Sequence, residues 1–388
     1  MPLNSKYVIP DGQSVLFDAV RIFATLAVFV QHATLAEFLY PHKVELLGRA
    51  VIPVFLLISG YMTAATMSRG GKFFRKSARR YVKYYFVVVP AIIIMFATDQ
   101  YLIAVESPIV DRDKFVADYS IQAILREIFD ALTYSGEYWR LTTEGQGLFG
   151  NVAYWTMDYI MAYVVITMAW YLVDGFKRFV VIGIAFLIAG PTVILLAPLW
   201  FVGVLAFEVH RLCGVAAELE KMGRIDEAAK WPALVRRMAP AIAVIGILLV
   251  ILVEKLGVGE TAYLESKSWA SYDLRQYLGM AKRFAWQWML LPGLFLLMIA
   301  SKYVVTWQPP EWMKRAARRT ALYTLPIYIF HYSFIYVARS FIPDYDPSYT
   351  SFDPYLMMAM AIGLTVFFAW LCFTFVQPVA DRLIARVF

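Results

Sequence analysis

Residues Leu16–Phe38 read LFDAVRIFATLAVFVQHATLAEF, an apolar run long enough to cross a membrane that nevertheless contains charged and titratable side chains. A charged side chain at bilayer depth costs at least ~2.5–3.5 kcal/mol on insertion scales, so Arg21 and His32 are functional candidates by default. The run lacks a small-residue cleavage pattern, which indicates a retained helix and not a signal peptide. It predicts a membrane helix that lines a polar site.

The polar residues of this predicted helix share one face. His32 follows Arg21 by eleven residues, and steps of ~100° leave the two about 20° apart around the axis and about 16.5 Å apart along it. Asp18 and Thr25 fall within about 40° of His32 on the same projection. This face must line a cavity or pack on polar partners. The alternative is a purely structural ion pair of Arg21 with Asp18 and a hydrogen-bonded histidine.

The whole chain has the composition of a membrane protein. Of its 388 residues, 61% are hydrophobic and only 17% are charged, and the mean hydropathy is +0.60. A soluble domain averages ~25% charged residues, so a water-soluble enzyme or a nucleic-acid-binding protein is excluded. Cys213 and Cys372 lie in or beside apolar runs and support neither a disulfide framework nor a metal site.

Apolar runs of roughly 18 residues, the length that a ~30 Å hydrocarbon core requires, recur along the chain and predict about ten spans. We therefore expect an all-α, polytopic transmembrane helix bundle that forms a single domain over residues 1–388. The predicted spans are Leu16–Phe38, Val44–Met67, Tyr81–Thr98, Val152–Val173, Phe179–Leu196, Leu199–Gly214, Ala239–Val253, Phe284–Ala300, Thr320–Phe341 and Tyr355–Gln377.

Basic residues predict the orientation of the bundle. With the N-terminus inside, cytoplasmic connections carry 23 Lys and Arg residues and external connections carry 11. This asymmetry predicts that both termini are cytoplasmic. Residues 99–150 then form an external loop, in which Ile121–Leu132 has apolar residues at helical spacing and predicts either an interfacial helix or an ordinary surface helix. No appended soluble domain is expected.

Several motifs follow one another in a recognisable order. The first is the Arg21-x10-His32 spacing, and the others are Val54-Phe55-Leu56-Leu57-Ile58-Ser59-Gly60-Tyr61, Phe73-Phe74-Arg75-Lys76-Ser77-Ala78-Arg79-Arg80, Tyr154-Trp155-Thr156-Met157-Asp158-Tyr159, Trp200-Phe201-Val202-Gly203, Leu325-Pro326-Ile327-Tyr328-Ile329-Phe330-His331 and Phe375-Val376-Gln377-Pro378. With these motifs the chain resembles, over nearly its whole length, the acyltransferase-3 family of integral membrane O-acyltransferases. It departs from the family where Ser77 replaces the first arginine of Arg-x-x-Arg and where Gln377 replaces the acid of Glu-Arg-Pro.

The resemblance implies transfer of an acyl group from cytoplasmic acyl-CoA to a hydroxyl of an extracytoplasmic polysaccharide or glucan. Acetyl is the commonest acyl group in the family and succinyl transfer is a known branch, and the sequence leaves both open. Acyl-CoA is then a co-substrate, with no permanently bound cofactor or metal. The expected partners are acyl-CoA, the glycan acceptor, the lipid bilayer and a polysaccharide-synthesis or acyl-accepting protein, and not nucleic acid. The expected location is the bacterial cytoplasmic (inner) membrane.

The resemblance also assigns roles to residues. His32 is the expected catalytic base, because a neutral histidine accepts a proton near physiological pH, and Arg21 is expected to hold a CoA phosphate. Candidate donor-binding residues are Arg75, Lys76, Arg79 and Arg80, for which an ordinary positive-inside loop is the alternative. Candidates for acceptor binding or support are Asp18, Thr25, Ser59, Tyr154, Trp155, Asp158 and His331.

Three alternatives apply to these candidates. Tyr154 and Trp155 are also typical of an aromatic belt at the membrane interface, and Ser59-Gly60 is typical of a close helix contact. His331 could equally be a packing histidine. A different class of protein, a transporter or flippase of a glycan or lipid-linked substrate, would use the same polar stripe as a substrate or proton pathway. Against it, the sequence has no detectable pair of inverted halves.

Overall fold

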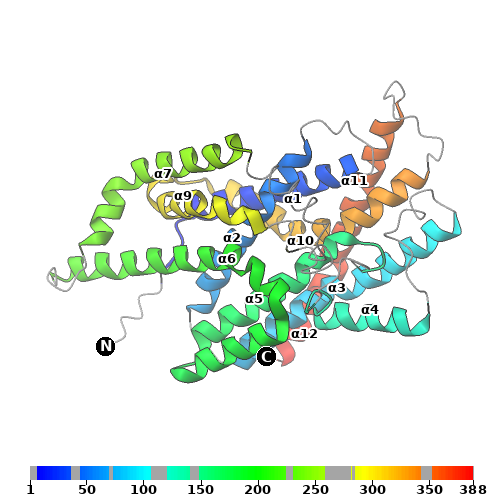
Figure 1. The fold of residues 1–388 in the computed structure, drawn as a ribbon, viewed down its shortest axis with the longest axis horizontal. Helices are drawn as coiled ribbons and strands as arrows, with labels where there is room; N and C mark the ends of the chain where they lie inside the picture. The colour runs from blue at the N-terminus through cyan, green and yellow to red at the C-terminus, as the bar shows by residue number, and fades with distance from the viewer. Residues whose placement is uncertain are drawn as a thin grey trace, which may run out of the picture.

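The fold is an all-helical bundle, as the apolar runs predict. The structure is a computed structural model that describes residues 7–35, 44–69, 73–105, 120–139, 148–223, 230–257, 281, 285–341 and 352–387. Within these ranges there is no strand, and the helices pack along one another in an elongated bundle (Figure 1). The main helices are α1 (Asp11–Leu35), α2 (Val44–Met67), α3 (Phe73–Ala104), α4 (Ile121–Thr133), α5 (Trp155–Leu172), α6 (Phe176–Lys221), α7 (Trp231–Lys255), α9 (Leu291–Val304), α10 (Glu311–Ser340), α11 (Asp353–Leu371) and α12 (Gln377–Val387).

The helices agree with the predicted membrane spans in place. In the described part of the chain, 7 helical runs are long and apolar enough to cross a membrane, and α2 contains a shorter apolar run, Val51–Met67. Each predicted span falls on one of these helices or on the buried helix α5. The prediction of a helical membrane bundle is therefore confirmed. The number of spans and the cytoplasmic location of the termini remain predictions.

The boundary between two predicted spans is wrong. The sequence placed a break between Leu196 and Leu199 because Pro198 follows there, but Pro198 lies inside α6. The only residue of α6 with non-helical backbone angles is Gly190, at φ 82° and ψ 180°. A positive φ of this size suits glycine and is strained for other residues. The chain therefore turns at Gly190, earlier than predicted.

The turn in α6 is capped by a residue from another segment. Pro191 has no N–H, so the carbonyl of Leu187 loses its partner in the helix. The indole nitrogen of Trp139 donates to that carbonyl at 2.8 Å, and the backbone N–H of Trp139 donates to the carbonyl of Ala189 at 3.2 Å. Trp139 thus supplies hydrogen-bond donors to both carbonyls at the turn.

Helices α2 and α6 cross in direct backbone contact. A Cβ atom on Gly60 would lie 2.2 Å from the carbonyl oxygen of Trp200, and one on Gly203 would lie 1.9 Å from that of Leu57. Only residues without a side chain permit such an approach. The interpretation of Gly60 as a close helix contact is confirmed, and Gly203 makes the reciprocal contact.

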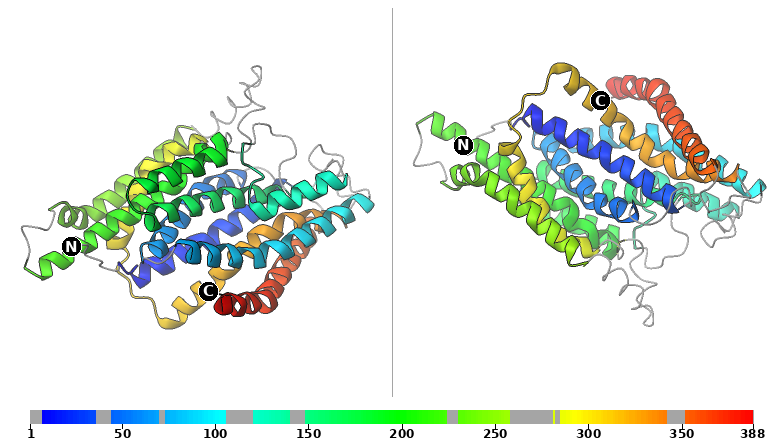
Figure 2. Two further views of the ribbon diagram at one scale, coloured as in Figure 1. Left: turned by 90° about the horizontal axis from the view of Figure 1, so that it is seen from below. Right: turned by 90° about the horizontal axis from the view of Figure 1, so that it is seen from above.

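Helix α1 occupies the middle of the arrangement that builds the site. It packs against α2 and α10, and Figure 2 shows dark-blue α1 running beside blue α2 and orange α10. In the predicted external loop, α4 forms where the helical spacing indicated it. The exposed side chains of Ile121, Leu125 and Phe129 lie on one face of α4, which favours the interfacial position over an ordinary surface helix.

Candidate functional site

Two histidines from distant parts of the chain meet between α1 and α10. The Nδ1 atom of His32 lies 2.8 Å from the Nε2 atom of His331, and their rings are within 9° of parallel. His331 is buried and His32 is half-buried. The sequence predicted each histidine as a candidate but did not predict that they form a pair.

The hydrogen bonds of this pair define which nitrogen carries each proton. His331 Nδ1 lies 2.6 Å from the backbone carbonyl of Tyr328, which can only accept, so Nδ1 is the donor. In a neutral ring, His331 Nε2 then carries the lone pair and accepts from the Nδ1–H of His32. Neutral His32 is therefore left with its lone pair on Nε2. That is the arrangement of a general base held in one tautomer by its neighbour.

Arg21 and Asp18 form an ion pair, which the sequence analysis gave as the structural alternative to a functional role for Arg21. The guanidinium nitrogen Nη1 of Arg21 lies 3.6 Å from Oδ1 of Asp18, one turn earlier on α1. Arg21 also lines a cavity, and its buried Nε has no hydrogen-bond partner among the described residues. The ion pair and a ligand-binding role are therefore compatible, because Asp18 can position the arginine while other nitrogens face the cavity.

The cavity beside Arg21 has a volume of about 570 Å³. Its wall comes from α1, α2, α3, α5, α6, α10 and the α11–α12 segment, mostly at ends that the basic-residue count predicts to be cytoplasmic. The basic side chains in this wall are Arg21, Arg79 and Lys83, and Ser59 also lines it. The volume lies within the range typical of small-molecule sites, and the basic groups suit a phosphate-bearing ligand.

The four predicted donor-binding residues have different outcomes. Arg79 lines the cavity, whereas Arg75 is exposed and does not line it. The side chains of Lys76 and Arg80 lie outside the described residues. The prediction missed Lys83, although a signal existed. Residues 79 and 83 share one helix face, but the span was predicted to begin at Tyr81 and α3 begins earlier, at Phe73.

A second, much narrower cavity lies along α1 between Arg21 and the histidines. It has a volume of about 20 Å³, and Thr25 of α1 lines it, with a hydroxyl that donates to the carbonyl of Arg21 at 3.0 Å. Phe55 of α2 lines both cavities. The Tyr328 ring lines the narrow cavity and lies 5.6 Å from the His331 ring, centroid to centroid. The two cavities and the histidine pair thus follow one another along the polar face of α1.

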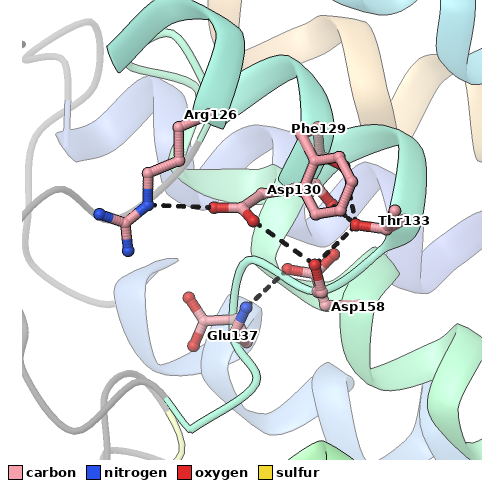
Figure 3. Close-up of polar contacts among 7 residues, drawn as sticks. Arg126, Phe129, Asp130, Thr133, Glu137 and Asp158 are labelled. Carbon is pink, nitrogen blue, oxygen red and sulfur yellow. Dashed lines mark hydrogen bonds and ion pairs between the residues drawn. The ribbon is translucent and has the colours of Figure 1, made fainter. Parts of the chain in front are cut away.

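Three candidates for acceptor binding or support, Tyr154, Trp155 and Asp158, line neither cavity. Tyr154 and Trp155 are buried in the bundle, so the interpretation as an interfacial aromatic belt is wrong for both. The Tyr154 hydroxyl donates to the carbonyl of Ala131 at 2.9 Å. Asp158 accepts from the backbone N–H of Glu137 at 3.0 Å, beneath the loop that joins α4 to α5 (Figure 3). These contacts tie Tyr154 to the end of α4 and Asp158 to the loop that follows it.

One supporting residue had no clear signal in the sequence. Asn151 is buried before α5, and its side-chain nitrogen lies 2.8 Å from the carbonyl of Ile329 and 3.2 Å from the hydroxyl of Ser333. Both partners belong to α10, on either side of His331 in the sequence. Asn151 therefore ties the start of the α5 segment to the part of α10 that carries the histidine.

Comparison with known proteins identifies a family for this chain. The model of the acyltransferase-3 family, described as an acyltransferase domain, matches residues 15–374. No curated protein and no solved structure matches the sequence. The matched range contains Arg21, His32, the basic start of α3 and His331, and it ends before α12.

Proposed function

The chain belongs to the acyltransferase-3 family, whose members are membrane O-acyltransferases, and from this premise we propose that it transfers an acyl group from cytoplasmic acyl-CoA to a hydroxyl of an extracytoplasmic glycan. The observation that carries the proposal is the sequence of sites along α1. A cavity with basic side chains, a small apolar cavity and a paired histidine follow one another along this helix. A phosphate-bearing thioester with a long flexible arm fits such a sequence of sites.

The basic cavity would hold the nucleotide end of the donor. Arg21, Arg79 and Lys83 supply positive charge for the phosphates, and a guanidinium group can make paired hydrogen bonds to phosphate oxygens. The pantetheine arm would then extend along α1 toward His32. The eleven-residue rise from Arg21 to His32, about 16.5 Å along the helix, is comparable with the reach of that arm.

The histidine pair would perform the transfer. His32 Nε2 takes the proton from the acceptor hydroxyl, and the oxygen attacks the thioester carbonyl carbon. A C–O bond forms, the C–S bond breaks, and the leaving CoA thiolate takes the proton from His32. While His32 is protonated, His331 accepts the hydrogen bond from Nδ1–H and keeps the ring oriented. His331 is therefore a positioning residue in this mechanism.

Transfer of label from donor to glycan tests the proposed function. Inverted membrane vesicles from cells with and without the gene expose the predicted cytoplasmic face to radiolabelled acetyl-CoA. We expect label in the glycan and release of free CoA only when the protein is present. Movement of glycan or lipid-linked substrate without consumption of thioester would instead indicate a transporter and would contradict the proposed acyl transfer.

Arg21→Ala is expected to weaken acyl-CoA binding by about 10–100-fold, because hydrogen bonds to charged groups contribute ~1.5–3 kcal/mol. Arg21→Lys should retain part of the affinity, since a point charge replaces a planar fork. The measurement is a dissociation constant for acetyl-CoA with purified protein in nanodiscs.

Arg211→Ala is the matched control. Arg211 also pairs with an acid three residues earlier, Glu208 at 2.7 Å, but it does not line the cavity. Unchanged affinity in folded Arg21→Ala would return Arg21 to a structural role.

A further inference from the structure

Asn151, which contacts α10 from the start of α5, is itself fixed within its own segment. Its side-chain oxygen accepts from the backbone N–H of Ala153 at 3.1 Å, and its backbone N–H donates to the carbonyl of Leu148 at 2.8 Å. The residue is 1% exposed, and its side-chain nitrogen donates to the carbonyl of Ile329 and to the hydroxyl of Ser333. Both N–H groups and the oxygen of the amide thus have partners, so Asn151 joins α5 to α10 in one defined arrangement.

A second contact comes from the first turn of α5 and reaches the residue that holds His331. The Thr156 hydroxyl lies 3.1 Å from the carbonyl of Ala153 and 3.0 Å from the Tyr328 hydroxyl. Tyr328 is buried, and its backbone carbonyl accepts from Nδ1 of His331 at 2.6 Å. The contacts therefore form a line from α5 through Tyr328 to His331, whose Nε2 lies 2.8 Å from Nδ1 of His32.

These contacts all fall on the same side of the proline in α10. Pro326 has no N–H, so one backbone hydrogen bond of this helix is missing there. A helix bends most easily at such a point. Tyr328, Ile329 and Ser333 all follow the proline, as His331 does. The contacts from α5 therefore hold the part of α10 that carries the histidine.

From these observations we infer that the start of α5 positions the histidine pair, with Asn151 and Thr156 as positioning residues that act through α10. This inference rests on the proposed function and adds the residues that keep His331 opposite His32. In that mechanism the base is oriented only while Nε2 of His331 faces Nδ1 of His32. A displacement of ~1 Å can cost ~10²-fold in rate, so a shift of α10 lowers the rate of transfer without changing how the donor binds.

The test measures the maximal rate of transfer per amount of protein and the KM for acetyl-CoA in the inverted vesicles. Thr156→Val removes the hydroxyl and keeps the branched shape, and Asn151→Ala removes the amide. Each is expected to lower the maximal rate at least about 10-fold and to leave KM within about 2-fold of the wild-type value. Thr156→Ser keeps the hydroxyl and should retain most of the rate.

Thr167→Val is the matched control for Thr156→Val. Thr167 is buried in the same helix, and its hydroxyl accepts from the indole nitrogen of Trp200 at 3.0 Å. The substitution removes a hydroxyl from a polar group of an aromatic partner, as Thr156→Val does, but the partner is in α6 and the site is about 16.5 Å further along α5. Thr167→Val should lower the thermal midpoint by a similar amount and leave the maximal rate unchanged.

A double variant keeps the test decisive if Thr156→Val does not accumulate as folded protein. Thr156→Val combined with Tyr328→Phe removes both hydroxyls, so neither is left buried without a partner, which can be nearly neutral for stability. The maximal rate should still lie at least about 10-fold below that of the wild type, because the contact between α5 and α10 is absent.

The possible results separate this inference from the proposed function. A wild-type maximal rate in folded Thr156→Val or Asn151→Ala would overturn the positioning role of that residue. An equal loss of rate in Thr167→Val would overturn it too, because the loss would then follow stability, and so would a raised KM with an unchanged maximal rate. No transfer from acetyl-CoA by wild-type protein would overturn the proposed function, and the positioning role with it.

Discussion

His32→Gln is expected to lower acyl transfer by ~10²–10⁴-fold, the usual loss when a general base is removed. Glutamine is close to histidine in size and retains hydrogen-bonding groups, but its amide cannot take a proton at neutral pH. The measurement is the initial rate of label transfer from acetyl-CoA, with donor affinity measured in parallel. Donor affinity should stay close to that of the wild type, because the basic cavity is untouched.

His331→Gln separates the two histidines of the pair. A positioning role predicts a smaller loss than for His32→Gln, since a glutamine at this position retains an acceptor for His32 Nδ1–H. If His32→Gln transferred acyl groups at nearly the wild-type rate, while His331→Gln did not, the base would be His331. The transfer rates of the two variants can be compared only if both give comparable protein yields and thermal midpoints.

Gly203→Val is expected to cost at least about 3 kcal/mol of stability or to prevent accumulation of folded protein. A Cβ at this position would lie 1.9 Å from the Leu57 carbonyl oxygen. That oxygen belongs to the helix backbone, so no side chain can rotate to make room, and α2 and α6 would have to separate. The measurement is the yield of monodisperse protein and its thermal midpoint in detergent.

Gly183→Val is the matched control for this substitution. Gly183 lies in the same helix, and a Cβ there would meet nothing within 4 Å. Both substitutions add the same β-branched side chain to α6, so any intrinsic cost in the helix is common to them. An equal thermal midpoint for the two variants would show that the α2–α6 contact tolerates a side chain.

Much of the fold could be predicted because membrane spans are a local property of the sequence. The length and apolarity of each run were sufficient to predict a helix at every predicted span. The turn in α6 shows the limit. Gly190-Pro191 and Pro198 both interrupt the apolar pattern in the sequence, but only at Gly190 does the backbone adopt a positive φ, beside the carbonyl that receives Trp139. The partner that selects between the two prolines lies about 50 residues away, beyond any local pattern.

The candidate site divides in the same way. Arg21 and His32 were predictable because a single helix relates them by its periodicity. The partner of His32 was not, because no pattern specifies how α1 and α10 pack. His331 and His210 are both buried, and their contacts differ. His210 is hydrogen-bonded to the Tyr61 hydroxyl at 2.7 Å and to the carbonyl of Ile299 at 3.0 Å.

Tyr154 and Trp155 show why burial is difficult to predict in this class of protein. Aromatic residues at the start of an apolar run are typical of the membrane interface. Here α5 is enclosed by its neighbours, and most of its residues are buried, so its start faces protein and not lipid headgroups. Whether a span is central or peripheral depends on its neighbours. A helix face that contacts other helices and one that contacts lipid are both apolar, so the sequence does not distinguish them.

The capping of α6 by Trp139 sets an order for biogenesis. The tryptophan is synthesised about 50 residues before the carbonyls that it caps, which at ~5–20 residues per second is about 3–10 s earlier. When the first part of α6 leaves the translocon, the donor for two of its carbonyls has therefore already been translocated. Replacement of Trp139 should consequently delay integration of α6 and expose the nascent chain to membrane quality-control proteases, while molecules that do mature keep their catalytic groups in place.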